Sequence, residues 1–195
     1  MGIDAGNDLA DMGRSPSRFR VNSAAPLRRG FSSGRMIATR TKTRGPTKML
    51  FDSKLMAMAR RAAEAEGLDA AVVCAVVEQE SGWNTWAMRY EPLFFAKYVA
   101  PLYTNNKVGA TEAYARGFSW GLMQVMGQTA REAGVTSLHL SALCDPAVGL
   151  PVGCKILRKK FDAVGGDMHK ALLAWNGGAN PDYADEVVAR VARYR

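Results

Sequence analysis

Helix start and stop signals recur along residues 50–195, and they limit the fold more than any other feature of the sequence. An aspartate often precedes an apolar helical pattern, where its side chain can accept a hydrogen bond from an unpaired amide of the first turn. Glycines often follow such a pattern, where a left-handed residue ends many helices. These signals predict helices from 52 or 53 to 67, 69 to 82, 129 to 133, 145 to about 164, 167 to 176 and 182 to 194, with a weaker candidate at 111–116.

Residues 50–195 lack a convincing alternating strand pattern, so we expect an all-α domain. Pro146 directly after Asp145 is a good helix start, because proline at the first helical position lacks only a donor that the helix could not use. The stretches between the predicted helices, 83–118 and 135–144, are expected to be long loops.

The positive charge of the chain is concentrated at its start. Residues 1–48 hold ten Lys and Arg against three Asp, a net charge of +7 out of +8 for the whole chain. This segment is rich in Gly, Ser, Pro and Arg and has too few apolar residues to offset its ordering entropy, so we expect a disordered basic arm before a folded domain at 49–195. The arm either contacts an anionic polymer or is a solvated leader, and translation from Met36 or Met49 would make it an upstream extension.

The three cysteines, Cys74, Cys144 and Cys154, cannot all pair with one another, and their spacing matches no zinc motif. We expect reduced, mostly buried thiols, with a bridge between Cys144 and Cys154 as the alternative in an oxidising compartment. His139 and His169 are isolated and belong to no metal or triad pattern. No metal or organic cofactor is implied.

The apolar stretches are short, and the longest of them, such as 70–77, could not span a bilayer. No apolar core region follows Met1, so no classical signal peptide is expected. A protein with a role outside the cytoplasm would then need another route. Delivery in a phage particle, release after membrane lysis and a dedicated secretion machine all stay open.

Glu80 is unusual within the predicted helix 69–82 because it falls on the apolar side. At 100° per residue Val73, Val76 and Val77 define an apolar stripe with Glu80 in its middle, whereas Glu78 points nearly the opposite way. Burial raises the pKa of a carboxyl group, and the dipole of the last helical turn repels an anion. Both effects favour the protonated state that a general acid needs. The competing interpretation is that the helix stops short and Glu80 lies in solvent.

Three motifs follow one another in the chain: ESGWN at 80–84, SWGLMQV at 119–125 and AWNGG at 174–178. Together with the helix start at Asp145 and with Tyr183, they resemble the soluble lytic transglycosylase (SLT) domain of the lysozyme-like superfamily. The stretch RYEP at 89–92 is similar to the variety found in bacteriophage and phage-derived members. The similarity covers residues 50–195.

The resemblance implies cleavage of peptidoglycan glycan strands by a single carboxyl group, here Glu80. In that mechanism the acid protonates the oxygen linking N-acetylmuramic acid to N-acetylglucosamine. It then takes the proton of the muramic C6 hydroxyl, which closes onto C1 to give a 1,6-anhydromuramic end without water. One group serves both steps because its two protonation states are used in sequence, whereas most glycoside hydrolases need two carboxylates.

The resemblance also assigns roles to other residues. Hydrogen bonds to Glu80 or the sugar are implied for Ser81, Gln124, Asn176 and Tyr183, apolar contact for Met123 and Trp175, and close backbone approach to the ligand for Gly121. For Met123 and Trp175 ordinary core packing is an equal alternative. Trp83, Trp86 and Trp120 lie in or beside the motifs, as sugar-stacking or structural rings, and for the glycines at 177–178 the alternative is that they only end a helix.

The sequence departs from the family pattern at two places. Trp175 stands where the third motif commonly has tyrosine, which puts in doubt any hydroxyl hydrogen bond there. The stretch between Glu80 and Gly121 is longer than in compact relatives and contains Glu91. This residue is either a second carboxylate near the site, which would favour a water-using muramidase, or the partner of Arg89 in a salt bridge that orders the loop, which we favour; Lys97 is the other candidate partner.

The leading hypothesis is therefore a lytic transglycosylase that acts at the bacterial cell wall, with peptidoglycan strands as its partner. A hydrolytic lysozyme on the same fold is the alternative enzyme. A non-catalytic wall- or virion-associated binding module is disfavoured, because a glutamate on an apolar stripe is costly without a use.

Overall fold

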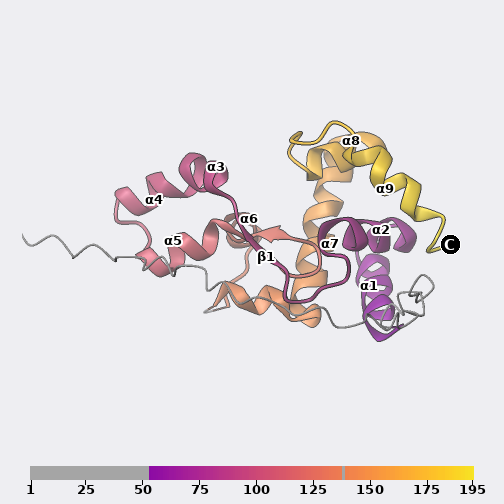
Figure 1. Ribbon diagram of the computed structural model, residues 1–195, viewed down its shortest axis with the longest axis horizontal. Helices are drawn as coiled ribbons and strands as arrows, with labels where there is room; N and C mark the ends of the chain where they lie inside the picture. The colour runs from indigo at the N-terminus through magenta and orange to yellow at the C-terminus, as the bar shows by residue number, and fades with distance from the viewer. Residues whose placement is uncertain (1–52, 138) are drawn as a thin grey trace, which may run out of the picture. The chain divides into compact units, whose positions relative to one another are not determined.

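Helices make up most of the part of the chain that the computed structural model describes, residues 53–137 and 139–195 (Figure 1). The elements are α1 (Ser53–Ala65), α2 (Ala70–Ser81), β1 (Met88–Tyr90), α3 (Pro92–Phe94), the π-helix η1 (Phe95–Val99), α4 (Ala100–Thr104), α5 (Ala110–Arg116), β2 (Phe118–Trp120), β3 (Val125–Met126), α6 (Gly127–Glu132), the 3-10 helix η2 (Leu140–Cys144), α7 (Pro146–Ala163), α8 (Met168–Trp175) and α9 (Tyr183–Val191). The predicted basic arm at 1–48 lies outside the described residues. Its separation from a catalytic domain at 49–195 stays a prediction.

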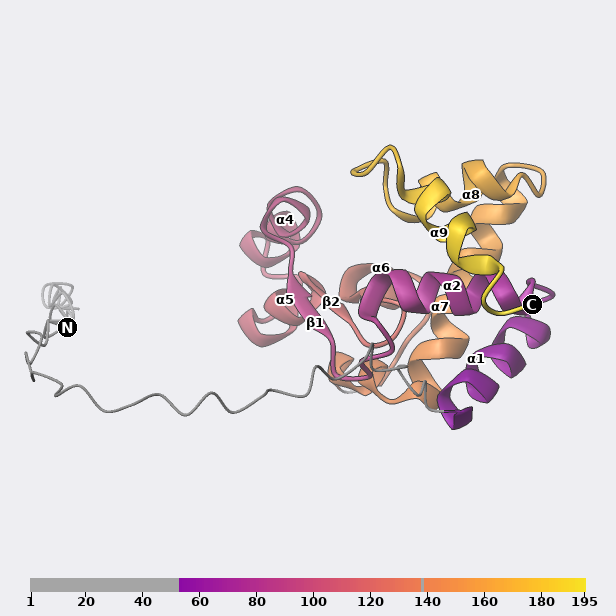
Figure 2. The ribbon, with the colours of Figure 1, turned by 45° about the vertical axis from the view of Figure 1, so that its right-hand side comes forward.

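α2 is the central helix, with α1 packed on one side of it and α9 on another (Figure 2). As predicted, the Asp69 side chain accepts a hydrogen bond of 2.8 Å from the Ala71 amide, and Gly82 ends the helix in the left-handed conformation. Every residue from Ala71 to Val77 is buried. The apolar stripe inferred from the sequence is therefore too narrow, because the helix is enclosed on all sides up to Val77.

Two further helix starts, at Asp145 and Asp167, are confirmed by side-chain caps onto the first turns of α7 and α8. Asp182 does precede α9, but its side chain makes no capping hydrogen bond, because its backbone is already helical there. The last helix also ends earlier than predicted, at Val191. The weaker candidate at 111–116 is confirmed as α5, and the one at 129–133 begins two residues sooner as α6.

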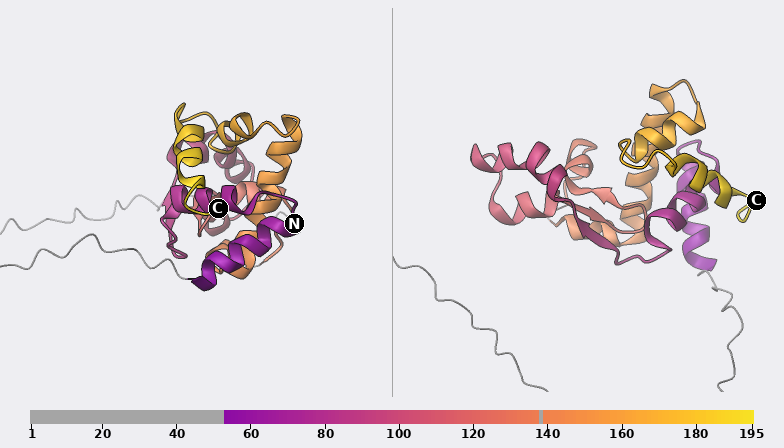
Figure 3. Two further views of the ribbon diagram at one scale, coloured as in Figure 1. Left: turned by 90° about the vertical axis from the view of Figure 1, so that its right-hand side faces the viewer. Right: turned by 45° about the horizontal axis from the view of Figure 1, so that its top comes forward.

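The prediction of a long loop at 83–118 is wrong, because most of this stretch forms short helices and strands. β1, β2 and β3 form a three-stranded antiparallel sheet in that order, with Met88 opposite Trp120 and Ser119 opposite Met126. The helices α3–α5 lie beyond this sheet, away from α8 and α9 (Figure 3). Rings of the sheet and of these helices contact one another: Tyr90, Phe95, Tyr114 and Phe118. Strands of two or three residues are too short to produce an alternating pattern.

The turn directly after α2 is held by a contact between Trp83 and Tyr194, which lies near the C-terminus. Trp83 has a φ of 67°, a left-handed conformation that costs a residue with a side chain about 1–2 kcal/mol. Its indole N–H donates to the Tyr194 hydroxyl at 3.0 Å, and that hydroxyl donates to Glu78 Oε2 at 2.8 Å. Both rings are buried. Glu78, opposite Glu80 on α2, thus helps to fix the end of the helix that carries Glu80.

The three cysteines are buried and free, as expected, and no bridge joins Cys144 to Cys154. Burial raises the pKa of Cys74 to about 11 and that of Cys154 to about 12, so these thiols are poor nucleophiles. Among the described residues, no helix combines the length and hydropathy needed to cross a membrane.

Gly121 offers a test of how tightly the sheet is joined to η2 and α7. Its φ is 68°, and a Cβ built there would lie 2.2 Å from the Leu143 carbonyl oxygen. We expect Gly121→Ala to lower the free energy of unfolding by roughly 3 kcal/mol or more, from strain and overpacking together. Urea unfolding followed by circular dichroism measures it.

Gly109→Ala is the matched control, because Gly109 has no positive φ and a Cβ there would meet nothing within 4 Å. A loss for Gly121→Ala no larger than that for Gly109→Ala would contradict this packing.

Candidate active site

Glu80 lies in the last turn of α2, where two donors from distant parts of the chain meet its carboxyl group. The indole N–H of Trp175 donates to Glu80 Oε1 at 2.9 Å, and the hydroxyl of Tyr183 donates to the same oxygen at 2.5 Å. Tyr183 is buried, and both Glu80 and Trp175 are partly buried. The competing interpretation, in which Glu80 lies in open solvent at the helix end, is therefore wrong.

The α8–α9 connection explains how both donors reach one oxygen. Trp175 is the last residue of α8 and Tyr183 the first of α9. Between them Gly177 and Gly178 both have positive φ, 68° and 75°, which residues with side chains rarely adopt. These glycines therefore end α8 and reverse the chain. Because α9 packs against α2, the reversal returns Tyr183 to the side of Glu80.

Desolvation dominates the electrostatics of Glu80. Partial burial raises the pKa of its carboxyl group from the ordinary value of 4.5, as the sequence predicts, while the hydrogen bonds from Tyr183 and Trp175 lower it less strongly. The pKa of Tyr183 is raised by burial and then by the neighbouring Glu80, so its hydroxyl stays protonated and remains a donor. The result is an acid that holds its proton to higher pH than an exposed glutamate does.

β1 and the residue after it bring two charges near Glu80. Arg89 lowers the pKa of Glu80, and Glu91 raises it. Arg89 and Glu91 form an ion pair with each other through Arg89 Nε and Glu91 Oε1, so of the two salt-bridge partners left open by the sequence, Arg89 and Lys97, the structure shows Arg89. Glu91 is therefore close enough to act on Glu80 through its charge, and its own carboxylate is engaged by Arg89.

A hydrogen-bond chain fixes the loop between α8 and α9. Gln79 Nε2 donates to Glu186 Oε2 at 2.6 Å, Asn180 Nδ2 donates to the same oxygen at 3.3 Å, and Asn176 Nδ2 donates to the Asn180 carbonyl at 3.3 Å. Gln79 precedes Glu80 in α2, so the chain ties the loop to the helix beside the carboxyl group. Asn176, expected to bind sugar, uses its amide N–H within this loop.

Several residues that the resemblance implies for sugar binding have other contacts. Ser81 donates its hydroxyl to the Val77 carbonyl at 3.1 Å, within α2. Met123 is only 1% exposed and packs against Gly153 of α7, where a Cβ would lie 2.4 Å from the methionine sulfur. Met123 therefore packs in the core, which is the alternative to the sugar contact that the resemblance implies.

The β2–β3 turn uses both Gly121 and Gln124 for its own structure. The backbone of Gly121 lies tightly against Leu143, and the approach to a ligand that the resemblance implies stays a prediction. Gln124 Oε1 accepts from Ser119, and its Nε2 donates to the carbonyls of Ala87 and Gly121 at 3.0 and 2.9 Å. Neither end of this amide is directed to a ligand in this geometry.

The donor role of Trp175 was missed by sequence reasoning. The absence of a hydroxyl puts a hydrogen bond at this position in doubt, but the indole N–H donates it. A partly buried tryptophan usually finds such a partner, which is the signal that could have indicated it. Among the described residues, no group of three or more His, Cys, Asp or Glu is placed to hold a metal ion.

A helical domain with a desolvated glutamic acid held by two protein donors defines an acid–base type of site. The chain matches the family model described as the transglycosylase SLT domain over residues 57–187, and it belongs to that family. It is a family of peptidoglycan lytic transglycosylases. The resemblance seen in the three motifs is thus confirmed.

One curated relative is a protein named "Transglycosylase" from Enterobacteria phage PRD1. It is 42% identical to this chain over 60 residues, which are 31% of this chain and 20% of the relative. The similarity therefore spans about a fifth of that protein's length. No solved structure matches the chain.

The two donors to Glu80 provide the next test. Both hydrogen bonds favour the carboxylate, so we expect Tyr183→Phe and Trp175→Phe each to raise the pKa of Glu80 above that of the unchanged chain, with the larger rise for Tyr183→Phe. The carboxyl carbon of Glu80, assigned by comparison with Glu80→Gln, can be titrated by ¹³C nuclear magnetic resonance.

Trp83→Phe is the matched control, because it removes an indole donor that bonds to Tyr194 and not to Glu80. A Glu80 pKa that stays the same or falls in both donor variants would show that the two hydrogen bonds do not set its titration.

Proposed function

We propose that this chain is a lytic transglycosylase that breaks the β-1,4 bond from N-acetylmuramic acid to N-acetylglucosamine and leaves 1,6-anhydromuramic ends, with Glu80 as its sole acid and base. The observation that carries the proposal is the convergence of Trp175 and Tyr183 on one oxygen of Glu80. Membership of the transglycosylase SLT domain family supports the same chemistry.

The convergence gives the two carboxyl oxygens different tasks. A neutral carboxyl group has one carbonyl oxygen, which accepts hydrogen bonds, and one hydroxyl oxygen, which carries the proton. Because Trp175 and Tyr183 both donate to Oε1, that oxygen is the acceptor and the proton resides on Oε2. Oε2 is then the atom that delivers the proton to the glycosidic oxygen, and desolvation favours the protonated acid by raising the pKa of the carboxyl group.

The first step transfers the Glu80 proton to the glycosidic oxygen as the bond from that oxygen to C1 of the muramic residue breaks. The resulting carboxylate is stabilised by the hydrogen bonds from Tyr183 and Trp175. In the second step the C6 hydroxyl oxygen forms a bond to C1 and gives its proton to Glu80. The carboxyl group returns to its starting state, and no water is consumed.

Glu91 is the specific observation that keeps hydrolysis as a second candidate. Its charge acts on Glu80, and a second carboxylate could activate a water molecule. The ion pair with Arg89 argues against this role, because it occupies Oε1 of the Glu91 carboxylate. A binding module without catalysis is disfavoured, because a desolvated glutamate is costly without a use.

Glu80→Gln tests the proposal directly. Glutamine keeps an acceptor oxygen for Trp175 and Tyr183 but has no proton to deliver, so we expect a folded protein whose release of fragments from purified peptidoglycan falls by about 10³-fold or more. Mass spectrometry of the products from the unchanged chain is expected to show ends lighter by one water than hydrolysed ends.

Glu91→Gln is the matched carboxylate control, for which we expect the same anhydro ends to form. Two results together would instead assign the muramidase mechanism. The unchanged chain would form hydrolysed ends, and Glu91→Gln would form them far more slowly. Undiminished cleavage by Glu80→Gln would remove the proposal altogether.

A further inference from the structure

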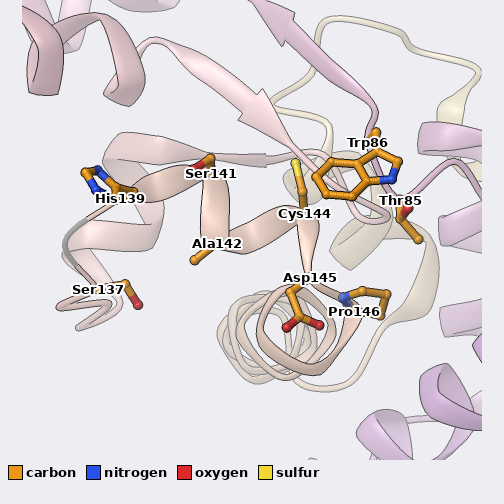
Figure 4. Close-up of a pocket in the computed structure, with 9 residues that line it drawn as sticks. All are labelled: Thr85, Trp86, Ser137, His139, Ser141, Ala142, Cys144, Asp145 and Pro146. Carbon is orange, nitrogen blue, oxygen red and sulfur yellow. The ribbon is translucent and has the colours of Figure 1, made fainter.

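A hollow lies at the start of α7, lined by residues that are not among those bonded to Glu80. Its volume is about 690 Å³, within the range of small-molecule sites. Figure 4 shows Thr85 and Trp86, which lead from α2 to β1, on one side and residues of η2 and the first turn of α7 on the other. The lining residues are Thr85, Trp86, Ser137, His139, Ser141, Ala142, Cys144, Asp145 and Pro146.

Trp86 is the unusual member of this hollow because 77% of its surface is exposed. Trp83 and Trp120 are each 8% exposed, and Trp175 is partly buried with its N–H bonded to Glu80. An indole is a large apolar surface, and covering it with another apolar surface is favourable by roughly 25 cal/mol per Å². The apolar surface of Trp86 is therefore left available for binding a ligand, because the fold does not bury it.

The backbone at Trp86 is fixed, so its ring is presented by a rigid support. The Trp86 amide donates to Asn84 Oδ1 at 3.0 Å. The carbonyl of the next residue, Ala87, accepts from the Gly121 amide at 2.8 Å and from Gln124 Nε2 at 3.0 Å. This also gives Gln124 a use: it anchors the segment that carries Trp86. A rigid aromatic side chain loses little entropy on binding.

The other side of the hollow combines apolar residues with a few polar side chains. Hydroxyl groups come from Ser137 and Ser141, an imidazole from His139 and a carboxylate from Asp145, while the Thr85 hydroxyl lies on the side of Trp86. One oxygen of that carboxylate, Oδ1, caps α7 by accepting from the Ala147 amide. The lining contains neither lysine nor arginine, so it has no permanent cation to pair with the carboxylates of a peptide. An aromatic face opposite neutral hydroxyl groups suits a sugar ring, which has an apolar face and a hydroxylated rim.

We propose that this hollow is a saccharide-binding site, separate from Glu80, in which Trp86 stacks on an N-acetylhexosamine ring of a glycan strand. The identity of the saccharide rests on the proposed function, since a wall-cleaving enzyme meets N-acetylated glycan strands. The site holds the protein on the polymer while Glu80 acts at another place. Residues 80 and 86 belong to one short connected segment, so both sites are set in a fixed relation to α2.

The indole N–H resonances of the four tryptophans give a residue-specific test. The full chain with Glu80→Gln, which cannot cleave, is labelled with ¹⁵N and titrated with the β-1,4-linked tetramer of N-acetylglucosamine. Trp86→Phe in the same background identifies the Trp86 signal by its loss. We expect that signal to shift in a saturable way.

The Trp175 signal separates this inference from the proposed function. A shift of the Trp175 signal without a shift of the Trp86 signal would place the sugar at Glu80 alone and overturn the second site. A shift of Trp86 that is produced by a stem peptide and not by the sugar, or no shift of Trp86 with the tetramer, would overturn it as well. None of these three results depends on cleavage activity, so each of them leaves the proposed function to be tested separately.

Binding to insoluble peptidoglycan gives a second measurement. In the Glu80→Gln background we expect Trp86→Ala to weaken binding roughly five- to tenfold, since stacking of an exposed ring contributes energy of that order. Leu93→Ala is the matched control, because Leu93 is 86% exposed and lies outside the hollow. Equal binding by the two variants would overturn the site, and the titration above decides the matter should Trp86→Ala fail to fold.

Discussion

The interaction between the Glu80 carboxyl group and its surroundings is the one that the other features of this domain support. Removing Glu80 from water raises its pKa, whereas the hydrogen bonds from Trp175 and Tyr183 support its charged form. The two influences oppose each other, and desolvation is the larger. Such a balance suits a group that must first give up a proton and then take one back, because desolvation favours the acid and the two hydrogen bonds favour the carboxylate that the first step forms.

The fold holds this carboxyl group from several directions. α2 is buried on all sides up to Val77, so the position of its last turn is fixed by the packing of α1 and α9. Beyond that turn Trp83 keeps an unfavourable backbone conformation because Tyr194 accepts its indole hydrogen bond. The α8–α9 reversal supplies both donors. Residues of α8 and α9 and Tyr194 therefore meet at the end of α2.

Local features of the fold were predictable from sequence because local chemistry decides them. The caps at Asp69, Asp145 and Asp167 depend on residues two or three positions away, and all three form. Asp182 shows the limit of this reasoning, since a capping side chain works only if the backbone before the helix is extended. The strands were not predictable, because two or three residues carry too little pattern.

The site was predictable in part. Glu80 and Tyr183 follow from the apolar pattern and the motifs, and the structure places them together. The packing of Met123 against Gly153 and of Gly121 against Leu143 was not predictable, because these partners are distant in sequence and no local pattern reveals such contacts. The hydrogen bond from Trp175 likewise depends on a tertiary contact, between the end of α8 and the end of α2.

The pH dependence of stability tests the central claim most directly. A group whose pKa is higher in the folded than in the unfolded protein makes the fold less stable as the pH rises through that interval. Urea unfolding of the unchanged chain and of Glu80→Gln should therefore give a difference in unfolding free energy that shifts in favour of Glu80→Gln as the pH rises above 4.5, the ordinary glutamate value, and then levels off. A difference that is constant with pH, or that shifts in favour of the unchanged chain, would contradict a desolvated, proton-holding Glu80.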